Sequence, residues 1–292
     1  MSQDGKWRTL SCLRFSPEVH RAPGRAYAQP VIRDVSTHMV LEADGAARIA
    51  LAIAVDCAAQ RESLEVVQDG KHLETDWLED PSGTRFEVVN VRAGKVEVDY
   101  TARIEGRTGP TQVSTLDQLI YLRPSRYCES DTLSPIANAE FEGLSGHALV
   151  DAISSWVGTH LSYVPGSSLS TDGAVATLLA RRGVCRDYAH LTVAMLRAMQ
   201  MPARVAAVYA PGLKPMDFHA VAEAAIDGLW RVVDPTTLAP RLSMLRIATG
   251  RDASDIAFVD TSGANVSLLE LKVMATADEL PPDDLTEFVS LG

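Results

Sequence analysis

Three residues in the second half of the chain have the types and the order that thiol-dependent catalysis requires. Cys185 closely follows Gly183 and stands at the start of a long predicted helix. A helix N-terminus presents unpaired N–H groups and a partial positive charge, and both stabilise a thiolate, the form of cysteine that attacks carbonyls. The same N–H groups can form part of an oxyanion hole. We therefore predict that Cys185 is a nucleophile.

A nucleophilic cysteine needs a base, and the base needs a residue that orients it. His219 and Asp234 are 15 positions apart and flank the turn signal Asp227-Gly228. With the turn midpoint at 227.5, His219 lies 8.5 positions before it and Asp234 lies 6.5 positions after it. The mismatch of two positions makes the two side chains diagonal neighbours across a hairpin, within reach of each other. The predicted roles are His219 as base and Asp234 as its orienting partner.

The elements that must position these residues have clear periodicities. Tyr188, Leu191, Met195 and Met199 recur at helical spacing after Cys185. Two further helices are expected at 146–157 and at 174–182, the second ended by Gly183, and strands at 203–209, 219–226 and 229–234. The second half of the chain is therefore predicted to be α+β, with helices packed on a sheet.

The first hundred residues have the alternating pattern of strands. Ile49, Leu51, Ile53 and Val55 occupy alternate positions, and short turn-bounded runs of this kind favour an antiparallel β-sandwich. The strands are expected at 35–42, 47–55, 63–67, 84–91 and 96–102. We predict an N-terminal β-sandwich domain at 1–110, a connecting segment at 111–145 and a catalytic domain at 146–292.

Composition narrows the class of protein. The 292 residues are 46% hydrophobic and 22% charged, and 27 basic against 38 acidic residues give a net charge of −11. This balance argues against binding to nucleic acid, which needs a positive face. No apolar run is long enough to span a membrane, and Met1 to Trp7 lack the apolar core of a signal peptide, so a cytoplasmic location is expected. We expect free thiols at Cys12, Cys57 and Cys128, in structural roles.

Three short motifs resemble those of the transglutaminase-like superfamily, in its bacterial branch. They are Gly183-Val184-Cys185-Arg186-Asp187-Tyr188-Ala189-His190, Asp217-Phe218-His219-Ala220 and Trp230-Arg231-Val232-Val233-Asp234-Pro235-Thr236. The segments 122–131 and 250–257 also resemble the flanks of this core, and the β-rich beginning resembles the N-terminal domain of bacterial members.

The resemblance implies a papain-like fold and amide chemistry through an acyl-enzyme intermediate. Bacterial members are often described as cysteine proteases, so the implied function is that of a cysteine protease, peptidase or amidase acting on a peptide or protein amide, without a metal or an organic cofactor. Related enzymes place an oxyanion-stabilising side chain upstream of the nucleophile, and Tyr163 is the candidate here. Arg186 and Val221 depart from the family pattern and argue against protein cross-linking.

Other readings stay open at this point. An amine acceptor in place of water would make the protein a transglutaminase, and loss of activity would leave a binding module with the same fold. Cys185, His190, His219 and Asp234 could alternatively hold a metal ion. His190 is expected to pack or cap rather than react, and Arg251, Asp252 and Asp255 suit an ion-pair network as well as substrate contact.

Overall fold

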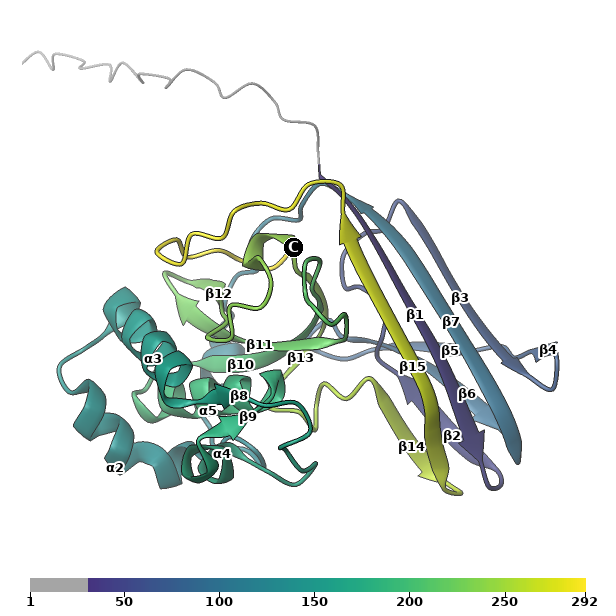
Figure 1. The fold of residues 1–292 in the computed structure, drawn as a ribbon, viewed down its shortest axis with the longest axis horizontal. Helices are drawn as coiled ribbons and strands as arrows, with labels where there is room; N and C mark the ends of the chain where they lie inside the picture. Colours follow the sequence, from purple (N-terminus) through teal and green to yellow (C-terminus); the bar gives the residue numbers. More distant parts are fainter. Residues whose placement is uncertain (1–30) are drawn as a thin grey trace, which may run out of the picture. The chain divides into compact units, whose positions relative to one another are not determined.

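The longest strands of the structure belong to one five-stranded antiparallel sheet. Its strand order is β15-β1-β7-β3-β4, and β1 pairs with β7 from Ile32 to Ala43 (Figure 1). These strands are β1 (Ile32–Ala43), β3 (Arg61–Gln68), β4 (Lys71–His72), β7 (Gly94–Glu105) and β15 (Val266–Ala277). The computed structural model describes residues 31–292, so the expectations on Met1 to Trp7 and on Cys12 lie outside the described residues.

A second antiparallel sheet shares its apolar core with the first. The order β14-β2-β6-β5 is formed by β2 (Ala47–Leu51), β5 (Asp76–Glu79), β6 (Arg85–Val91) and β14 (Val259–Gly263). Met39 from the first sheet and Ile49 from the second are fully buried in the same apolar cluster. Alternate residues of both sheets face this core, as the period-2 pattern predicts.

The last two strands of the chain, β14 and β15, pair with the first two, β2 and β1. Both late strands fall in the part of the sequence assigned to the catalytic domain, and they were not expected from the sequence. The three-part division of the chain stays a prediction.

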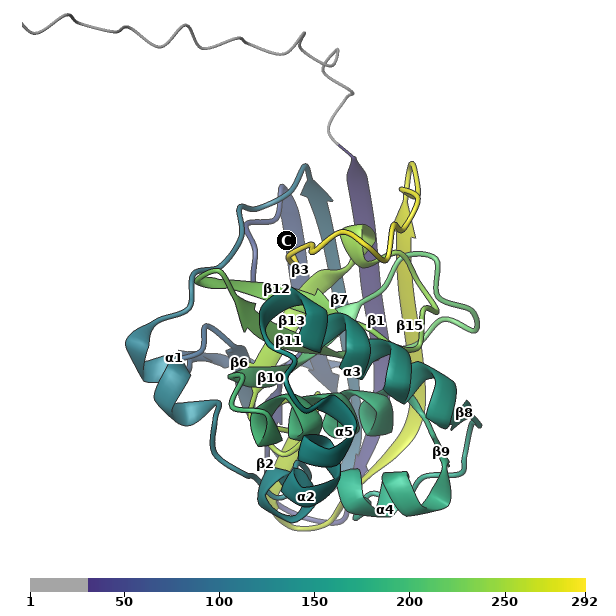
Figure 2. The same cartoon turned by 90° about the vertical axis from the view of Figure 1, so that its left-hand side faces the viewer.

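A third sheet carries the residues predicted for catalysis, and helices cover it. Its order is β12-β11-β10-β13, formed by β10 (Ala203–Tyr209), β11 (His219–Ile226), β12 (Leu229–Val233) and β13 (Leu245–Gly250). The helix α5 (Cys185–Ala198) packs on β10 and β11, and α2 (Ser130–Phe141), α3 (Gly146–His160) and α4 (Ala174–Ala180) pack around α5 (Figure 2). A short parallel pair, β8 (Ser162–Tyr163) and β9 (Arg182–Gly183), lies beside the start of α5.

The predicted α+β class with antiparallel sheets is confirmed, and two local predictions need correction. The strand expected at 47–55 ends at Leu51, because the backbone then bonds to other segments: Ala52 N–H donates to Phe258 O at 3.0 Å and Tyr209 Oη donates to Ile53 O at 2.8 Å. The predicted connecting segment at 111–145 was given no helix, but it contains α1 (Thr115–Ile120) and α2.

A buried ion network joins the third sheet to the segment after β2. The Glu223 carboxylate is fully buried, accepts from Arg204 Nε at 2.8 Å and pairs with Arg246, which also contacts Asp56 at 3.1 Å. Burial alone would raise the pKa of Glu223, but the charges of Arg204 and Arg246 bring it below the ordinary value. Two buried guanidinium groups thus meet at one fully buried carboxylate.

Replacing Glu223 by Gln should therefore destabilise the fold, because it leaves Arg204 and Arg246 buried with too little negative charge. We expect the free energy of unfolding in urea to fall by about 3–5 kcal/mol. Glu97→Gln is the matched control, since Glu97 pairs with Lys95 at 2.8 Å on the exposed face of β7. That control should unfold like the unmodified chain. Equal effects of the two substitutions would contradict the importance of the buried network.

Candidate active site

Cys185 is the first residue of α5, as the sequence predicts. Val184 precedes it in an extended conformation (φ −113°, ψ −178°), and its carbonyl accepts the first bonds of the helix, from Asp187 N–H at 2.9 Å and Tyr188 N–H at 3.1 Å. The N–H groups of Cys185 and Arg186 come before these bonds and are therefore available to a ligand. The Cys185 side chain is half-buried, so the thiol is accessible at the helix N-terminus.

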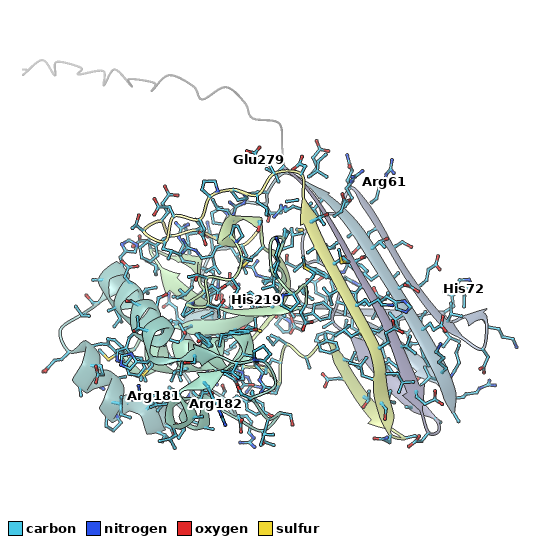
Figure 3. The ribbon with its side chains drawn as sticks, in the orientation of Figure 1. Arg61, His72, Arg181, Arg182, His219 and Glu279 are labelled. Atoms are coloured by element: carbon cyan, nitrogen blue, oxygen red, sulfur yellow. The ribbon has the colours of Figure 1, made fainter. Side chains whose placement is uncertain are left out.

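His219 and Asp234 meet across the β11–β12 hairpin. The hairpin pairs Ala222 with Val233 and Ile226 with Leu229, which is the register expected from a turn at Asp227-Gly228. His219 Nε2 lies 2.8 Å from Asp234 Oδ2, and both side chains are about 1% exposed. Figure 3 shows His219 inside the described part of the chain, whereas Arg181 and Arg182 lie at its surface.

The contact with Asp234 occupies Nε2 of His219 and leaves its other ring nitrogen, Nδ1, for a second interaction. Nδ1 is buried and has no hydrogen-bond partner among the described residues. Burial acts to lower the pKa of His219, but the charge and hydrogen bond of Asp234, followed by the nearby Cys185 thiol, raise it to about 10. For Asp234, burial acts to raise the pKa, and the charge of His219 brings it below the ordinary value. The imidazole is thus held as an imidazolium next to the sulfur at neutral pH.

Further contacts fix the carboxylate of Asp234. Thr236 donates its backbone N–H at 3.0 Å and its hydroxyl at 2.7 Å to Asp234 Oδ1. Gly158 of α3 lies so close that an added Cβ would be 3.0 Å from the Pro235 carbonyl oxygen. Neither Thr236 nor Gly158 was predicted as a site residue, although Asp-Pro-Thr is a sequence typical of a side-chain-stabilised turn.

Tyr163 also lies at the nucleophile. Its β8 pairs with β9 at Gly183, and Val164 N–H donates to Gly183 O at 2.9 Å. Burial and the Cys185 thiol raise the pKa of Tyr163 to about 12, although a hydrogen bond with the Cys185 backbone acts to lower it. The phenol is therefore a neutral donor at physiological pH, next to the N–H of Cys185. The structure brings Tyr163, Cys185, His219 and Asp234 into one place.

The role expected for Gly183 was wrong in one respect. α4 ends at Arg181, which adopts the left-handed conformation (φ 55°), and Gly183 lies beyond the helix end in β9. Gly183 is needed for another reason, since an added Cβ would lie 2.6 Å from the Cβ of Asp187. Asp187 was missed from the sequence, although an acidic residue at the third helical position is a capping signal.

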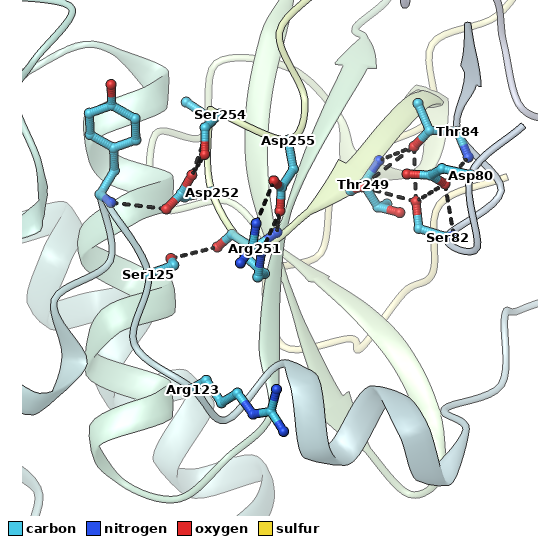
Figure 4. Close-up of polar contacts among 12 residues, drawn as sticks. Asp80, Ser82, Thr84, Arg123, Ser125, Thr249, Arg251, Asp252, Ser254 and Asp255 are labelled. Carbon is cyan, nitrogen blue, oxygen red and sulfur yellow. Dashed lines mark hydrogen bonds and ion pairs between the residues drawn. The ribbon is translucent and has the colours of Figure 1, made fainter. Parts of the chain in front are cut away.

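The remaining candidate residues pack against or hydrogen-bond to other parts of the fold. His190 Nε2 accepts Ala253 N–H at 3.1 Å, its ring stacks on Tyr127 at 5.4 Å, and burial lowers its pKa to about 3. Asp252 accepts Tyr127 N–H at 2.9 Å and Ser254 N–H at 3.0 Å. Figure 4 shows Asp252 and Ser254 in contact. Cys57 and Cys128 are buried free thiols.

Other kinds of site find little support in the part of the chain that is described. Residues 31–292 contain no group of three or more His, Cys, Asp or Glu side chains placed to hold a metal ion. None of the helices between residues 31 and 292 has the length and apolar character of a membrane span. A cavity of about 540 Å³ between α3 and the end of β12 has Asp234 in its lining but neither Cys185 nor His219. This cavity is therefore not the space in front of the thiol.

The chain is similar to known proteins in sequence and in fold. A crystal structure of a candidate cysteine protease from Cytophaga hutchinsonii is similar, with a TM-score of 0.78 and 29% sequence identity over 91% of this chain and 94% of that one. An uncharacterised protein of Mycobacterium leprae is 27% identical over 146 residues, which are 47% of this chain and 52% of the relative, so the match spans about half of that protein.

Residues 140–235 match the model of the transglutaminase-like superfamily, and this range holds Cys185, His219 and Asp234. The resemblance of the three sequence motifs is thus confirmed at the level of the superfamily. This part of the chain is thus similar to a transglutaminase-like core.

Proposed function

We propose that this protein hydrolyses amide bonds of peptides or proteins through a Cys185–His219–Asp234 triad. The observation that carries the proposal is the position of a half-buried thiol at a helix N-terminus, next to a histidine whose other nitrogen is bound to a buried aspartate. The similarity to a candidate cysteine protease over 91% of the chain supports hydrolysis as the outcome.

The proposed reaction begins with attack of the Cys185 sulfur on the amide carbonyl carbon. The new S–C bond forms as the C=O π electrons move to oxygen, and Tyr163 Oη and Cys185 N–H are placed to stabilise this oxyanion. His219 then donates its proton to the amide nitrogen, the C–N bond breaks, and the amine leaves. An acyl-enzyme and a neutral imidazole remain.

Water completes the cycle. The neutral His219 takes a proton from water, whose oxygen attacks the thioester carbon, and the C–S bond breaks to release a carboxylic acid. Asp234 holds the imidazole in place through both steps and stabilises its charged form. An amine that replaces water at this step gives transamidation, the alternative that the superfamily match keeps open.

The nucleophile can be tested by covalent labelling. Cys185→Ala should abolish labelling by a peptidyl electrophile, measured by mass spectrometry of the chain in a Cys12→Ser background. Cys57→Ala is the matched control and should keep full labelling, because burial raises the pKa of the Cys57 thiol. Labelling that survives Cys185→Ala would refute the assignment. Products formed with and without a primary amine then distinguish hydrolysis from transamidation.

The role of Asp234 can be tested through the titration of His219. Asp234→Asn removes the charge that contributes most to raising the pKa of the imidazole but leaves its burial, so the midpoint should fall well below 10. The imidazolium form would then be lost at a lower pH, and the alkaline limb of the reaction should shift by roughly two or more pH units in the same direction. Asp217→Asn, an exposed acid two residues before His219, is the control and should leave the midpoint unchanged.

Nitrogen chemical shifts of ¹⁵N-histidine measure this midpoint directly, and the His219 signal is assigned by its loss in His219→Gln. An unchanged midpoint in Asp234→Asn would show that Asp234 does not control the base.

A further inference from the structure

A second buried carboxylate lies two residues after the nucleophile and has no part in the proposed proton transfers. The Asp187 side chain is about 1% exposed. Its Oδ2 accepts Val184 N–H at 2.8 Å, and its Oδ1 accepts the Ser168 hydroxyl at 2.8 Å. A buried carboxylate or donor without a hydrogen-bond partner costs free energy. These bonds therefore hold the backbone at Val184 and the loop at Ser168 in place.

The fit between Asp187 and Gly183 is tight. An added Cβ on Gly183 would lie 2.6 Å from Asp187 Cβ and 2.8 Å from Asp187 Oδ2. The carboxylate thus packs directly over the backbone that leads into Cys185. The Gly183–Val184 peptide is held by this contact and by the bond to Val184 N–H.

The same carboxylate anchors the loop formed by residues 164–172. Arg186 Nη2 donates to Ser168 Oγ at 2.6 Å and to the Leu169 carbonyl at 2.6 Å, and Ser168 in turn donates to Asp187. The start of the loop is tied by the bond from Val164 N–H to Gly183 O. Leu169 is 67% exposed, so this loop presents an apolar side chain close to the start of α5.

We propose that Asp187 is a positioning residue for the chemistry at Cys185. It fixes the Gly183–Val184 peptide, which leads into Cys185, so that Cys185 N–H stays beside Tyr163, and it holds the 164–172 loop against the start of α5. The proposal rests on the proposed amide chemistry for its catalytic part, whereas the anchoring of the loop does not depend on that chemistry.

The anchoring can be measured without a ligand. Asp187→Ala and Ser168→Ala should each increase backbone hydrogen exchange in residues 164–172 by at least about tenfold, because both remove the bond from Ser168 Oγ to Asp187 Oδ1, one of the bonds that tie the loop to α5. Asp117→Ala is the matched control, since Asp117 caps α1 in the same way, by accepting Ser114 N–H at 2.8 Å. The control should leave exchange in the loop unchanged. Unchanged exchange in Ser168→Ala and Asp187→Ala would refute the anchoring.

The effect on chemistry is tested with two reagents that differ in their need for an oxyanion hole. A peptide aldehyde reacts by forming an S–C bond while its carbonyl oxygen takes the proton of His219, so it needs the donors at Tyr163 and Cys185. With iodoacetamide, the Cys185 sulfur attacks the CH₂ carbon and displaces iodide, so no oxyanion forms. Asp187→Ala should weaken aldehyde binding about 100-fold, as expected for a misplaced hole. Alkylation of Cys185 by iodoacetamide should change by less than about threefold.

Two further variants keep the test decisive if Asp187→Ala folds poorly. Asp187→Asn keeps an acceptor for Val184 N–H and should retain aldehyde binding to within about tenfold. Gly183→Ala forces the carboxylate aside and should reproduce the loss seen in Asp187→Ala. Equal losses with both reagents would refute a positioning role. If the unmodified chain is alkylated at Cys185 but does not bind the aldehyde, the proposed carbonyl chemistry fails, and hydrogen exchange alone then decides the anchoring.

Discussion

Helix α5 is buried from Asp187 to Ala198, and only its first two residues are partly exposed. A helix in this position cannot shift without disturbing the sheet beneath it and the helices around it. Arg197 strengthens the constraint, because its buried guanidinium donates to carbonyls from three other segments, at Ala203, Arg123 and Arg251. The start of α5 is therefore a fixed point on which a reactive thiol can be held.

The parts of the site that local geometry determines were predictable from the sequence. The turn at Asp227-Gly228 sets the register of the hairpin, and the register places His219 diagonally from Asp234. Cys185 follows the same logic, since the apolar spacing after it predicts where the helix starts. The role of each residue in the triad remains a proposal, but the contact between His219 and Asp234 follows from one hairpin.

Contacts between distant segments could not be predicted in this way. The bond from Ser168 to Asp187 depends on where an irregular loop crosses the start of α5, and no period in the sequence encodes that crossing. The strands β14 and β15 were missed because β15 has an irregular burial pattern and β14 is mostly exposed. Their pairing partners lie more than 200 residues away, at the beginning of the described chain.

The pairing of β14 and β15 with the first strands limits the order in which the two large sheets can form. β15 forms the outer edge of a sheet whose next strand is β1, so the free edge of β1 stays open until nearly all of the described chain is available. Pairing across such a distance is slow, because the entropy of closing the chain must be overcome first. During synthesis the two large sheets cannot be completed before residues 140–235, which hold the candidate site, have been made. The outermost strands β14 and β15 are therefore the last strands of these sheets that can pair.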